Sequence, residues 1–239
     1  MTPIRQKRRG GLDRFAAWPE AFPSRPRVTR EEMVRLALDI LDKDGIDGLA
    51  MRRLAERMRI RAASLYNHVT GKGELLTLIA DAICGELAEI TAGGDWRAQL
   101  ETVAIRFRHV LLSHQDGARV LASTAPIGPN RLQIIESVLN ALVRAGFSDA
   151  EATDAAWVHN SYVVGFVLDE TLGRASGIVS SRRSREKGKR WLKPLSKEQY
   201  PTLVALANEV ADVRPDRRFE FGLRALLDGF ELRLATKRR

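Results

Sequence analysis

The sequence predicts an all-α protein, with a helix-turn-helix unit of three helices at the N-terminus and a larger helical domain after it. Apolar residues recur every three or four positions through most of the 239 residues, which is the spacing of one buried helix face. No segment alternates convincingly between apolar and polar residues, as a half-buried strand would. The fold class follows from these two observations.

The first predicted helix begins after Thr29 and ends at Gly45. Thr29 and Glu32 have the spacing of a capping box, in which each residue bonds the backbone N–H of the other. An apolar stripe at helical spacing follows them: Val34, Ala37, Leu38 and Leu41. Residues 28–74 are expected to form one small domain that starts with this helix.

Two short apolar segments follow and are joined by a tight connection. Leu54, Ala55 and Met58 share one face of the first, and Leu65 and Val69 share one face of the second. Six basic side chains accompany a single acid: Arg52, Arg53, Arg57, Arg59, Arg61 and Lys72. This pattern is typical of a helix-turn-helix whose second helix enters the DNA major groove. A solvated basic helix pair inside a bundle is the alternative.

Eight residues of this unit are candidate DNA contacts. Ala62 and Ala63 are small enough to let the second helix approach base edges, and Arg52 has the fork geometry that binds guanine bidentately. The others donate hydrogen bonds to phosphates, which sets register without reading sequence. They are Ser64, Tyr66, Asn67, His68 and Lys72.

These segments resemble the DNA-binding domain of the tetracycline-repressor family of transcription regulators. The likeness rests on KDGIDGL (43–49), MRRLAERM (51–58) and LYNHVTGKGELL (65–76). FRHVLLSHQDGARV (107–120) and FEFGLRALLDGFEL (219–232) are similar to the effector-binding domain of the tetracycline-repressor branch itself. Many members of the family share only the DNA-binding part.

The chain departs from that family at two positions of the first domain. Ala50 stands where relatives often have Thr at a helix start, so a side-chain cap is expected to be missing. Arg59 replaces the usual turn Gly, so the turn is expected to be strained or adjusted.

Residues 75–239 are expected to form the effector-binding and dimerisation domain. Further helices are predicted over 76–90, 96–113, 117–123, 129–145 with Gly146 as C-cap, 148–173, 197–211 and 216–235. Residues 174–197 lack an apolar period and hold nine basic side chains against one acid, which indicates a mobile loop. A second nucleic-acid site in that loop is the alternative.

The resemblance implies a homodimer held by a four-helix bundle. The two faces expected to meet their copies are Ala155, Val158, Tyr162, Phe166 and Asp169, and Phe219, Leu223, Leu226, Phe230 and Leu234. Two-fold symmetry would then place the recognition helices about 35 Å apart, one turn of B-DNA. A purely intrachain core is the alternative.

The resemblance also implies an effector pocket, and here the chain departs most. Positions that bind a magnesium–drug chelate in tetracycline repressors correspond to Ala88, Val103, Phe107, Leu121, Thr124, Val138 and Asp169. Phe107 and Thr124 match the family, but Leu121 replaces the metal-ligating His and offers no ligand atom.

The family's polar drug contacts are also replaced, by Ala88, Val103 and Val138, and its Glu by Asp169. We therefore expect no response to magnesium–tetracycline and a hydrophobic organic effector with few polar groups instead. Asp169 or His159 would supply one of its few polar contacts, unless each is structural or interfacial.

Net charge is +9 and is distributed unevenly. Residues 1–30 hold eight basic and two acidic side chains, and residues 1–27 are expected to form a basic, mostly disordered arm. Such an arm adds salt-sensitive affinity for DNA. An inert solvated tail is the alternative.

Other classes of function find little support in the sequence. The four histidines form no metal or catalytic motif, so no catalytic residue, metal site or cofactor is expected. Cys84, the one cysteine, is predicted to be a buried thiol. His114 is expected to make a local hydrogen bond, and Asp116 to cap the helix after it. Without a secretory signal or a membrane-spanning apolar run, the expected location is cytoplasmic, on the nucleoid when DNA is bound.

These features predict a repressor that binds a palindromic operator as a homodimer. A small organic effector would release it by shifting the population toward a form whose DNA-binding ends no longer match adjacent grooves. The helix over about 72–90 would carry the motion, because it packs on both domains. The alternatives are an activator or ligand-independent regulator, and a small-molecule-binding protein that has lost operator binding.

Overall fold

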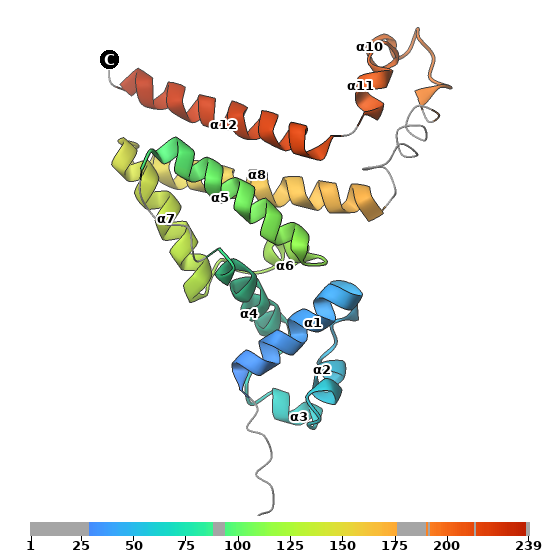
Figure 1. Cartoon of the computed structure of the whole chain (residues 1–239), viewed down its shortest axis with the longest axis vertical. Helices are drawn as coiled ribbons and strands as arrows, with labels where there is room; N and C mark the ends of the chain where they lie inside the picture. Colours follow the sequence, from blue (N-terminus) through green and yellow to red (C-terminus); the bar gives the residue numbers. More distant parts are fainter. Residues whose placement is uncertain (1–28, 88–93, 176–189, 191, 213, 238–239) are drawn as a thin grey trace, which may run out of the picture.

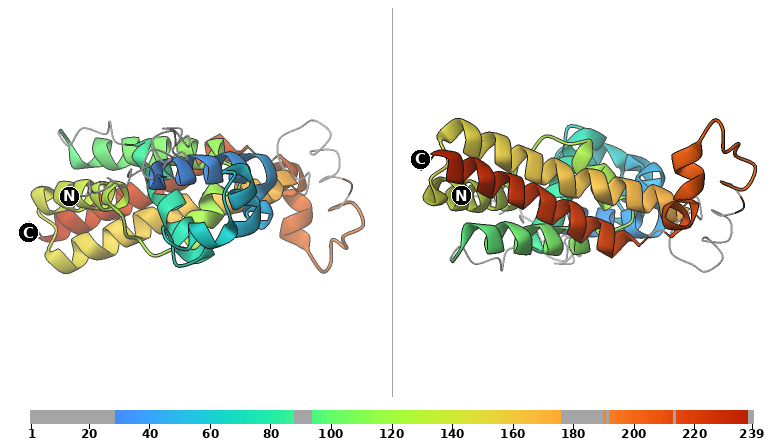
Figure 2. Two further views of the ribbon diagram at one scale, coloured as in Figure 1. Left: turned by 90° about the horizontal axis from the view of Figure 1, so that it is seen from below. Right: turned by 90° about the horizontal axis from the view of Figure 1, so that it is seen from above.

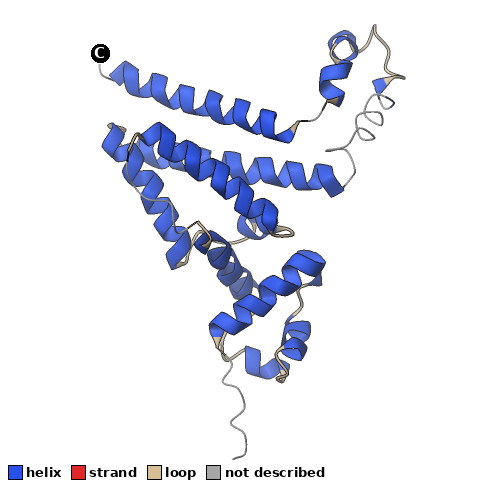
Figure 3. Ribbon diagram, in the orientation of Figure 1, coloured by secondary structure: helices blue, strands red, loops and turns tan. Residues whose placement is uncertain are grey.

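Helices make up all the regular structure of the computed structural model (Figure 3), which describes residues 29–87, 94–175, 190, 192–212 and 214–237. None of the described residues is in a strand, which confirms the all-α prediction. The predicted arm over 1–27, the candidate Ala88 and most of the predicted loop over 174–197 lie outside the described residues.

The helices follow the predicted order with few differences. They are α1 (Arg30–Gly48), α2 (Met51–Arg57), α3 (Ala62–Leu65), α4 (Lys72–Gly85), α5 (Trp96–Ser113), α6 (Gly117–Ala122), α7 (Pro129–Ala145), α8 (Asp149–Ala175), α10 (Pro201–Ala205), α11 (Ala207–Ala211) and α12 (Pro215–Lys237). The helix predicted over 76–90 ends earlier, at Gly85, and the one predicted over 197–211 is two short helices, α10 and α11.

The molecule has a small head and a larger body (Figure 1). The head is α1, α2 and α3, and the body is α5, α6, α7, α8 and α12, with α4 between them. Seen from above, α8, α12 and α5 run side by side across the body's far surface (Figure 2). The head and the far surface of the body therefore lie at opposite ends. The predicted boundary between residues 74 and 75 stays a prediction, and it falls within α4.

α1 begins as predicted and contains a break. The Thr29 hydroxyl accepts a hydrogen bond from the Glu32 N–H at 3.1 Å, which satisfies one donor that the first turn leaves free. Helical geometry fails at Gly45, where φ is 71°. The break frees the Ile46 N–H, which donates to the Asp116 carboxylate at 2.9 Å. A side chain at position 45 would meet that carboxylate, so glycine is needed there.

Two residues of the turn between α5 and α6 join the body to the head, contrary to prediction. Asp116 makes no side-chain cap for α6 and bonds α1 instead. His114 lies between two distant carboxylates, with Nδ1 3.0 Å from Asp42 Oδ1 and Nε2 2.7 Å from Glu86 Oε1. The prediction of local contacts was wrong because these partners are far away in sequence.

α4 packs against helices of both parts. Its buried side chains include Leu75, Ile79 and Ile83. Asp81, also on α4, accepts a hydrogen bond from the Arg131 N–H at 2.9 Å and so caps α7 from outside. Gly128, the residue before α7, has φ 115°, and a Cβ there would overlap the Asp81 carboxylate. α4 is therefore fixed to the start of α7 by a polar contact.

The predicted dimer face of α12 packs mostly inside the chain. Phe219, Leu223, Phe230 and Leu234 are all buried, and the Tyr162 hydroxyl on α8 donates to the Phe219 carbonyl at 2.7 Å. α12 is apolar on more than one side, so the spacing of its apolar residues does not determine which side packs on α8 and α5. For these four residues the prediction that they meet a partner was wrong, whereas Leu226, the fifth, is only partly buried.

Ion pairs add to the packing of α12 on the body. Arg108 on α5 contacts buried Glu170 on α8 at 2.8 Å and Asp216 on α12 at 2.7 Å. Its guanidinium also lies 5.0 Å from the centre of the Phe219 ring. One side chain thus joins three helices of the body.

The junction at His114 should make stability depend on pH. Burial alone would lower the pKa of His114, but its hydrogen bonds to Glu86 and Asp42 outweigh burial and raise the pKa above 6.5. The protonated ring therefore stabilises the folded chain. This contribution is complete below pH 6.5 and is lost as pH rises through the folded-state pKa.

We expect His114→Gln to lower the urea midpoint more at about pH 6 than at about pH 8.5. His109→Gln is the matched control, because His109 is exposed on α5, the helix that ends just before His114. Its effect should be small and equal at both pH values. An equal effect of His114→Gln at the two pH values would contradict the role of the charged ring.

Candidate nucleic-acid interface and effector cavity

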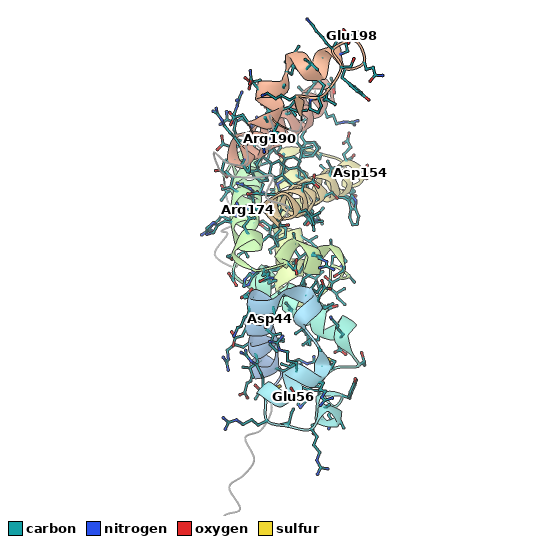
Figure 4. The ribbon with its side chains drawn as sticks, turned by 90° about the vertical axis from the view of Figure 1, so that its right-hand side faces the viewer. Asp44, Glu56, Asp154, Arg174, Arg190 and Glu198 are labelled. Carbon is teal, nitrogen blue, oxygen red and sulfur yellow. The ribbon has the colours of Figure 1, made fainter. Side chains whose placement is uncertain are left out.

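The start of α2 carries the two features that its sequence suggested. Ala50 occupies the N-cap position and makes no side-chain bond, as predicted. Arg52 follows with its side chain 89% exposed and Nε 3.1 Å from Glu56 Oε1. Figure 4 shows Glu56 near the outer end of the head, with Asp44 closer to the body. Arg52 is thus exposed on α2, held only by an exposed ion pair of small net strength.

One of the six basic side chains bonds another helix of the head. Arg53 is half-buried, with Nη2 2.6 Å from Asp44 Oδ2 and Nη1 3.4 Å from the Gly48 carbonyl oxygen. Arg53 therefore fixes α2 to the end of α1, a role that the sequence pattern did not predict, and its side chain stays 42% exposed. The periodic pattern missed this because Asp44 is nine residues away.

The turn between α2 and α3 is strained at Arg59. Its φ is 55°, in the left-handed region that costs side-chain-bearing residues energy. The Ile60 N–H still donates to the Ala55 carbonyl at 3.0 Å, so the turn keeps a hydrogen bond that closes α2. The expectation that Arg59 strains the turn is confirmed.

α3 presents the other candidate DNA contacts at the end of the head (Figure 1). Leu65 and Val69 are buried in the hydrophobic core, with α3 packed on α2, which turns the opposite side of the segment outward. Ala62, Ala63 and Asn67 are exposed, and Tyr66 is 56% exposed. Ser64 and His68 are half-buried.

Two basic side chains, one at the start of α4 and one at the start of α1, donate to backbone carbonyls of the head. Lys72 Nζ donates to the Ile46 carbonyl at 2.9 Å, so one of its three N–H groups is engaged inside the protein. Arg30, which was not a candidate, donates to the His68 carbonyl at 2.7 Å. No sequence signal marked Arg30, because the two residues are 38 positions apart.

A cavity of about 260 Å³ lies inside the body. Residues of α4, α5, α7 and α8 surround it, together with the segment before α7. They are Cys84, Val103, Phe107, Pro126, Arg131, Ile134, Ile135, Val138, Leu139, Thr153, Ala156, Trp157, His159 and Asn160. Most of these side chains are apolar, as in many small-molecule sites.

Arg131 and His159 are the buried polar side chains of this cavity. Arg131 was not a candidate, although a signal existed. It lies three, four and seven residues before Ile134, Ile135 and Val138, and so falls on the apolar face of its helix. His159 Nε2 lies 2.9 Å from the Leu100 carbonyl oxygen. Burial lowers the pKa of His159, so its ring is neutral near pH 7.

Known proteins share this arrangement. The family of tetracyclin repressor-like C-terminal domains matches residues 91–234. The chain belongs to the tetracycline-repressor family. Members of the family are DNA-binding transcription regulators, and solved relatives are all-α with an N-terminal helix-turn-helix.

Three relatives illustrate the likeness. A helix-turn-helix-type transcriptional regulator from Saccharopolyspora erythraea is 37% identical over 68% of this chain and 72% of its own length. The class A tetracycline repressor of transposon 1721 from Escherichia coli is 35% identical over 84% of this chain and 89% of its own. ActR of Streptomyces coelicolor, solved with actinorhodin, superposes with a TM-score of 0.77 at 30% identity, over 87% of this chain and 99% of its own.

In this member of the tetracycline-repressor family, three of the seven expected effector contacts line the cavity. They are Val103, Phe107 and Val138. Leu121 and Thr124 lie beside it, where the Leu121 carbonyl and the Thr124 hydroxyl accept bonds from Arg131. Asp169 is exposed on α8 and does not line the cavity. Ala88 lies outside the described residues.

Two further features bear on other chemistry. Cys84 is buried as predicted, and burial raises the pKa of its thiol to about 12. Among the described residues, no group of three His, Cys, Asp or Glu side chains is placed to hold a metal ion. Within the same residues, no helix is both long enough and apolar enough to cross a membrane.

Replacing Arg59 with Gly should stabilise this regulator. Gly adopts positive φ without the steric cost, but it loses more chain entropy on folding, so we expect a net gain of about 1 kcal/mol in the free energy of unfolding. Arg57→Gly, at the exposed last residue of α2, should instead lose about 1 kcal/mol. Urea denaturation measures both. A loss of stability in Arg59→Gly would show that the turn is not strained.

Proposed function

We propose that the protein is a repressor that binds a palindromic operator as a homodimer and leaves it when a small apolar effector, other than magnesium–tetracycline, occupies the cavity. One observation carries this proposal. The exposed face of α2 and α3 lies in the head, and the cavity between α5, α7 and α8 lies in the body (Figure 1). α4 contacts α1 of the head and also helices that line the cavity.

The face of the head suits a DNA groove. Ala62 and Ala63 leave the backbone of α3 accessible, and a helix of that kind can come close to base edges. Exposed Tyr66 and Asn67 follow on the same segment and can donate to phosphates. Exposed arginines at 52, 57, 59 and 61 give the surface the positive charge that DNA binding requires.

The far surface of the body suits a two-fold interface. α8 and α12 lie side by side there (Figure 2). Leu172 on α8 is 66% exposed, and Phe221 and Leu232 on α12 are 75% and 68% exposed. Large apolar side chains at this exposure commonly mark protein–protein contacts. Gly165 and Gly229 have open space where a Cβ would be, so another helix can approach closely.

α4 is placed to carry a signal between cavity and head. Cys84 near its end lines the cavity, Asp81 bonds α7, and Lys72 at its start bonds the Ile46 carbonyl in the head. An effector that shifts α7 or α6 therefore acts on the helix that positions α1. Such a ligand releases DNA only if it binds the released form more tightly.

The cavity does not suit a magnesium chelate. Magnesium requires oxygen ligands in octahedral geometry. Leu121 stands at the family's metal-ligating position, and the cavity side chains Val103 and Val138 replace two polar drug contacts. An apolar organic molecule fits these residues better.

As a DNA-binding regulator, the protein would act in the cytoplasm, where bacterial DNA is.

The repressor hypothesis can be tested by selecting genomic fragments with the purified protein and footprinting the enriched DNA. We expect a palindromic footprint that anhydrotetracycline with magnesium leaves unchanged. A footprint that disappears with the drug would refute the argument from Leu121. Failure to enrich any sequence would favour a binding protein that has lost its operator, and a promoter fusion that is activated rather than repressed would favour an activator.

Two substitutions test the division of roles on the head. Arg52→Ala should cost about 1–3 kcal/mol of operator binding and relax sequence preference, if Arg52 reads a base. Lys72→Ala should weaken binding evenly on operator and random duplexes, after thermal melting shows that loss of the Ile46 bond leaves the head folded. Arg144→Ala, an exposed arginine on α7 in the body, is the control and should change neither. Equal losses on both duplexes for both variants would contradict the division.

A further inference from the structure

The cavity contains one ionised side chain in an otherwise neutral lining. Arg131 is the only Asp, Glu, Lys or Arg among the described residues that line it. The residue is 8% exposed, and three of its nearest lining neighbours along α7, Ile134, Ile135 and Val138, are aliphatic. A cation buried among apolar groups is costly unless its charge is compensated.

Neutral oxygens hold the Arg131 guanidinium in place. Nη1 donates to the Thr124 hydroxyl at 3.0 Å and to the Ala125 carbonyl at 3.1 Å, and Nη2 donates to the Leu121 carbonyl at 3.3 Å. These bonds orient the group at the end of α6, where the helix dipole is negative. A guanidinium has five N–H donors. The Nε–H and one N–H of Nη2 have no acceptor within the described part of the chain.

The nearest carboxylate does not form an ion pair with this guanidinium. Asp81 Oδ1 accepts from the backbone N–H of Arg131, and Asp81 Oδ2 lies 3.1 Å from Asn130 Nδ2. No described Asp or Glu lies within ion-pair distance of the Arg131 side chain. Burial lowers the pKa of Arg131, which agrees with a cation that is only partly compensated.

His159, the second buried polar side chain of the cavity, provides a hydrogen-bond acceptor and no charge. Because His159 is neutral and its Nε2 contacts a carbonyl oxygen, the proton belongs on Nε2 and Nδ1 is left as an acceptor. The two buried polar side chains thus offer one cationic donor and one neutral acceptor, and Phe107 and Trp157 add aromatic surface to the cavity.

We propose that the effector is an aromatic carboxylic acid whose carboxylate pairs with the Arg131 side chain while its ring occupies the apolar part of the cavity. This inference rests on the proposed function, in which the cavity is the effector site. A carboxylate matches the planar donor geometry of a guanidinium and would form charge-assisted hydrogen bonds in a site of low polarity. It would also supply an ion-pair partner, whereas Asp81 acts on the Arg131 cation only from a distance.

The first test compares two probes of the same shape on the wild-type protein. Calorimetry would measure binding of 2-naphthylacetate and of 2-naphthylacetamide, which differ in charge at one group. We expect the acid to bind at least about tenfold more tightly than the amide. Equal binding, tighter binding of the amide, or binding of neither probe would overturn the inference.

Variants of Arg131 then test whether this residue causes the preference for the acid over the amide. Arg131→Met should abolish the preference for the acid and leave amide binding within about twofold, whereas Arg131→Lys should keep part of it. Arg131→Met also removes the bonds to the end of α6, so it is a fair test only if it unfolds at a temperature close to that of the wild type.

A second pair of variants leaves those bonds intact. Val138 lies two turns from Arg131 on the same face of α7 and lines the cavity. Val138→Glu places a carboxylate in the cavity and should remove the preference for the acid by at least about tenfold, whereas the matched Val138→Gln should keep it. An unchanged preference in Val138→Glu, or its loss in both variants, would overturn the assignment to Arg131.

Footprinting without any probe keeps this inference separate from the proposed function. If the operator footprint is present but the acid is not preferred, only the ligand class is wrong. If the acid is preferred but no DNA is bound, the repressor proposal fails and the acid site stands.

Discussion

The break in α1 at Gly45 is the constraint on which the relation between head and body depends. It frees the Ile46 N–H, which donates to Asp116 of the body, and the Ile46 carbonyl, in the last turn of α1, accepts from Lys72 of α4. His114 adds a second contact by bridging Asp42 and Glu86. Buried or half-buried polar groups must be satisfied, so these partners fix one position of the head. An unbroken helix would satisfy its own backbone and offer the body no such attachment.

Polar contacts also fix the helices on the other side of α4. Gly128 leaves room for the Asp81 carboxylate, which caps α7 by bonding the Arg131 N–H, while the Arg131 side chain bonds the end of α6. The first turn of α7 is therefore tied to two helices. Because Arg131 also lines the cavity, whatever enters the cavity meets a side chain that is already part of the packing of α6, α7 and α4. Arg131 is therefore both a lining residue of the cavity and a residue that fixes the positions of α4, α6 and α7.

The two ends of the molecule use opposite chemistry. The head exposes charge and small side chains, and Arg52 is held only by an exposed ion pair with Glu56. The body buries Arg108 in an ion pair with Glu170, and leaves apolar side chains exposed on α8 and α12. The charged surface of the head and the exposed apolar side chains of α8 and α12 thus lie at different ends of the molecule. Because α4 has only 14 residues, a displacement of one end of this helix also displaces the other end.

The sequence by itself determined the helical fold, the order and approximate bounds of the helices, the helix-turn-helix and the family, because helical period, capping residues and the LYNHVTGKGELL motif are local signals. It also marked Ala50 and Arg59 correctly as irregular positions. Only the tertiary structure decided that α12 turns its Phe219 face inward, that Arg53 and His114 bond distant carboxylates, and that Asp169 lies outside the cavity while Arg131 lines it. Each of these depends on partners far apart in the chain, or on which of two apolar faces of a helix is covered. Helical period records that a face is apolar, and only packing determines what the face contacts.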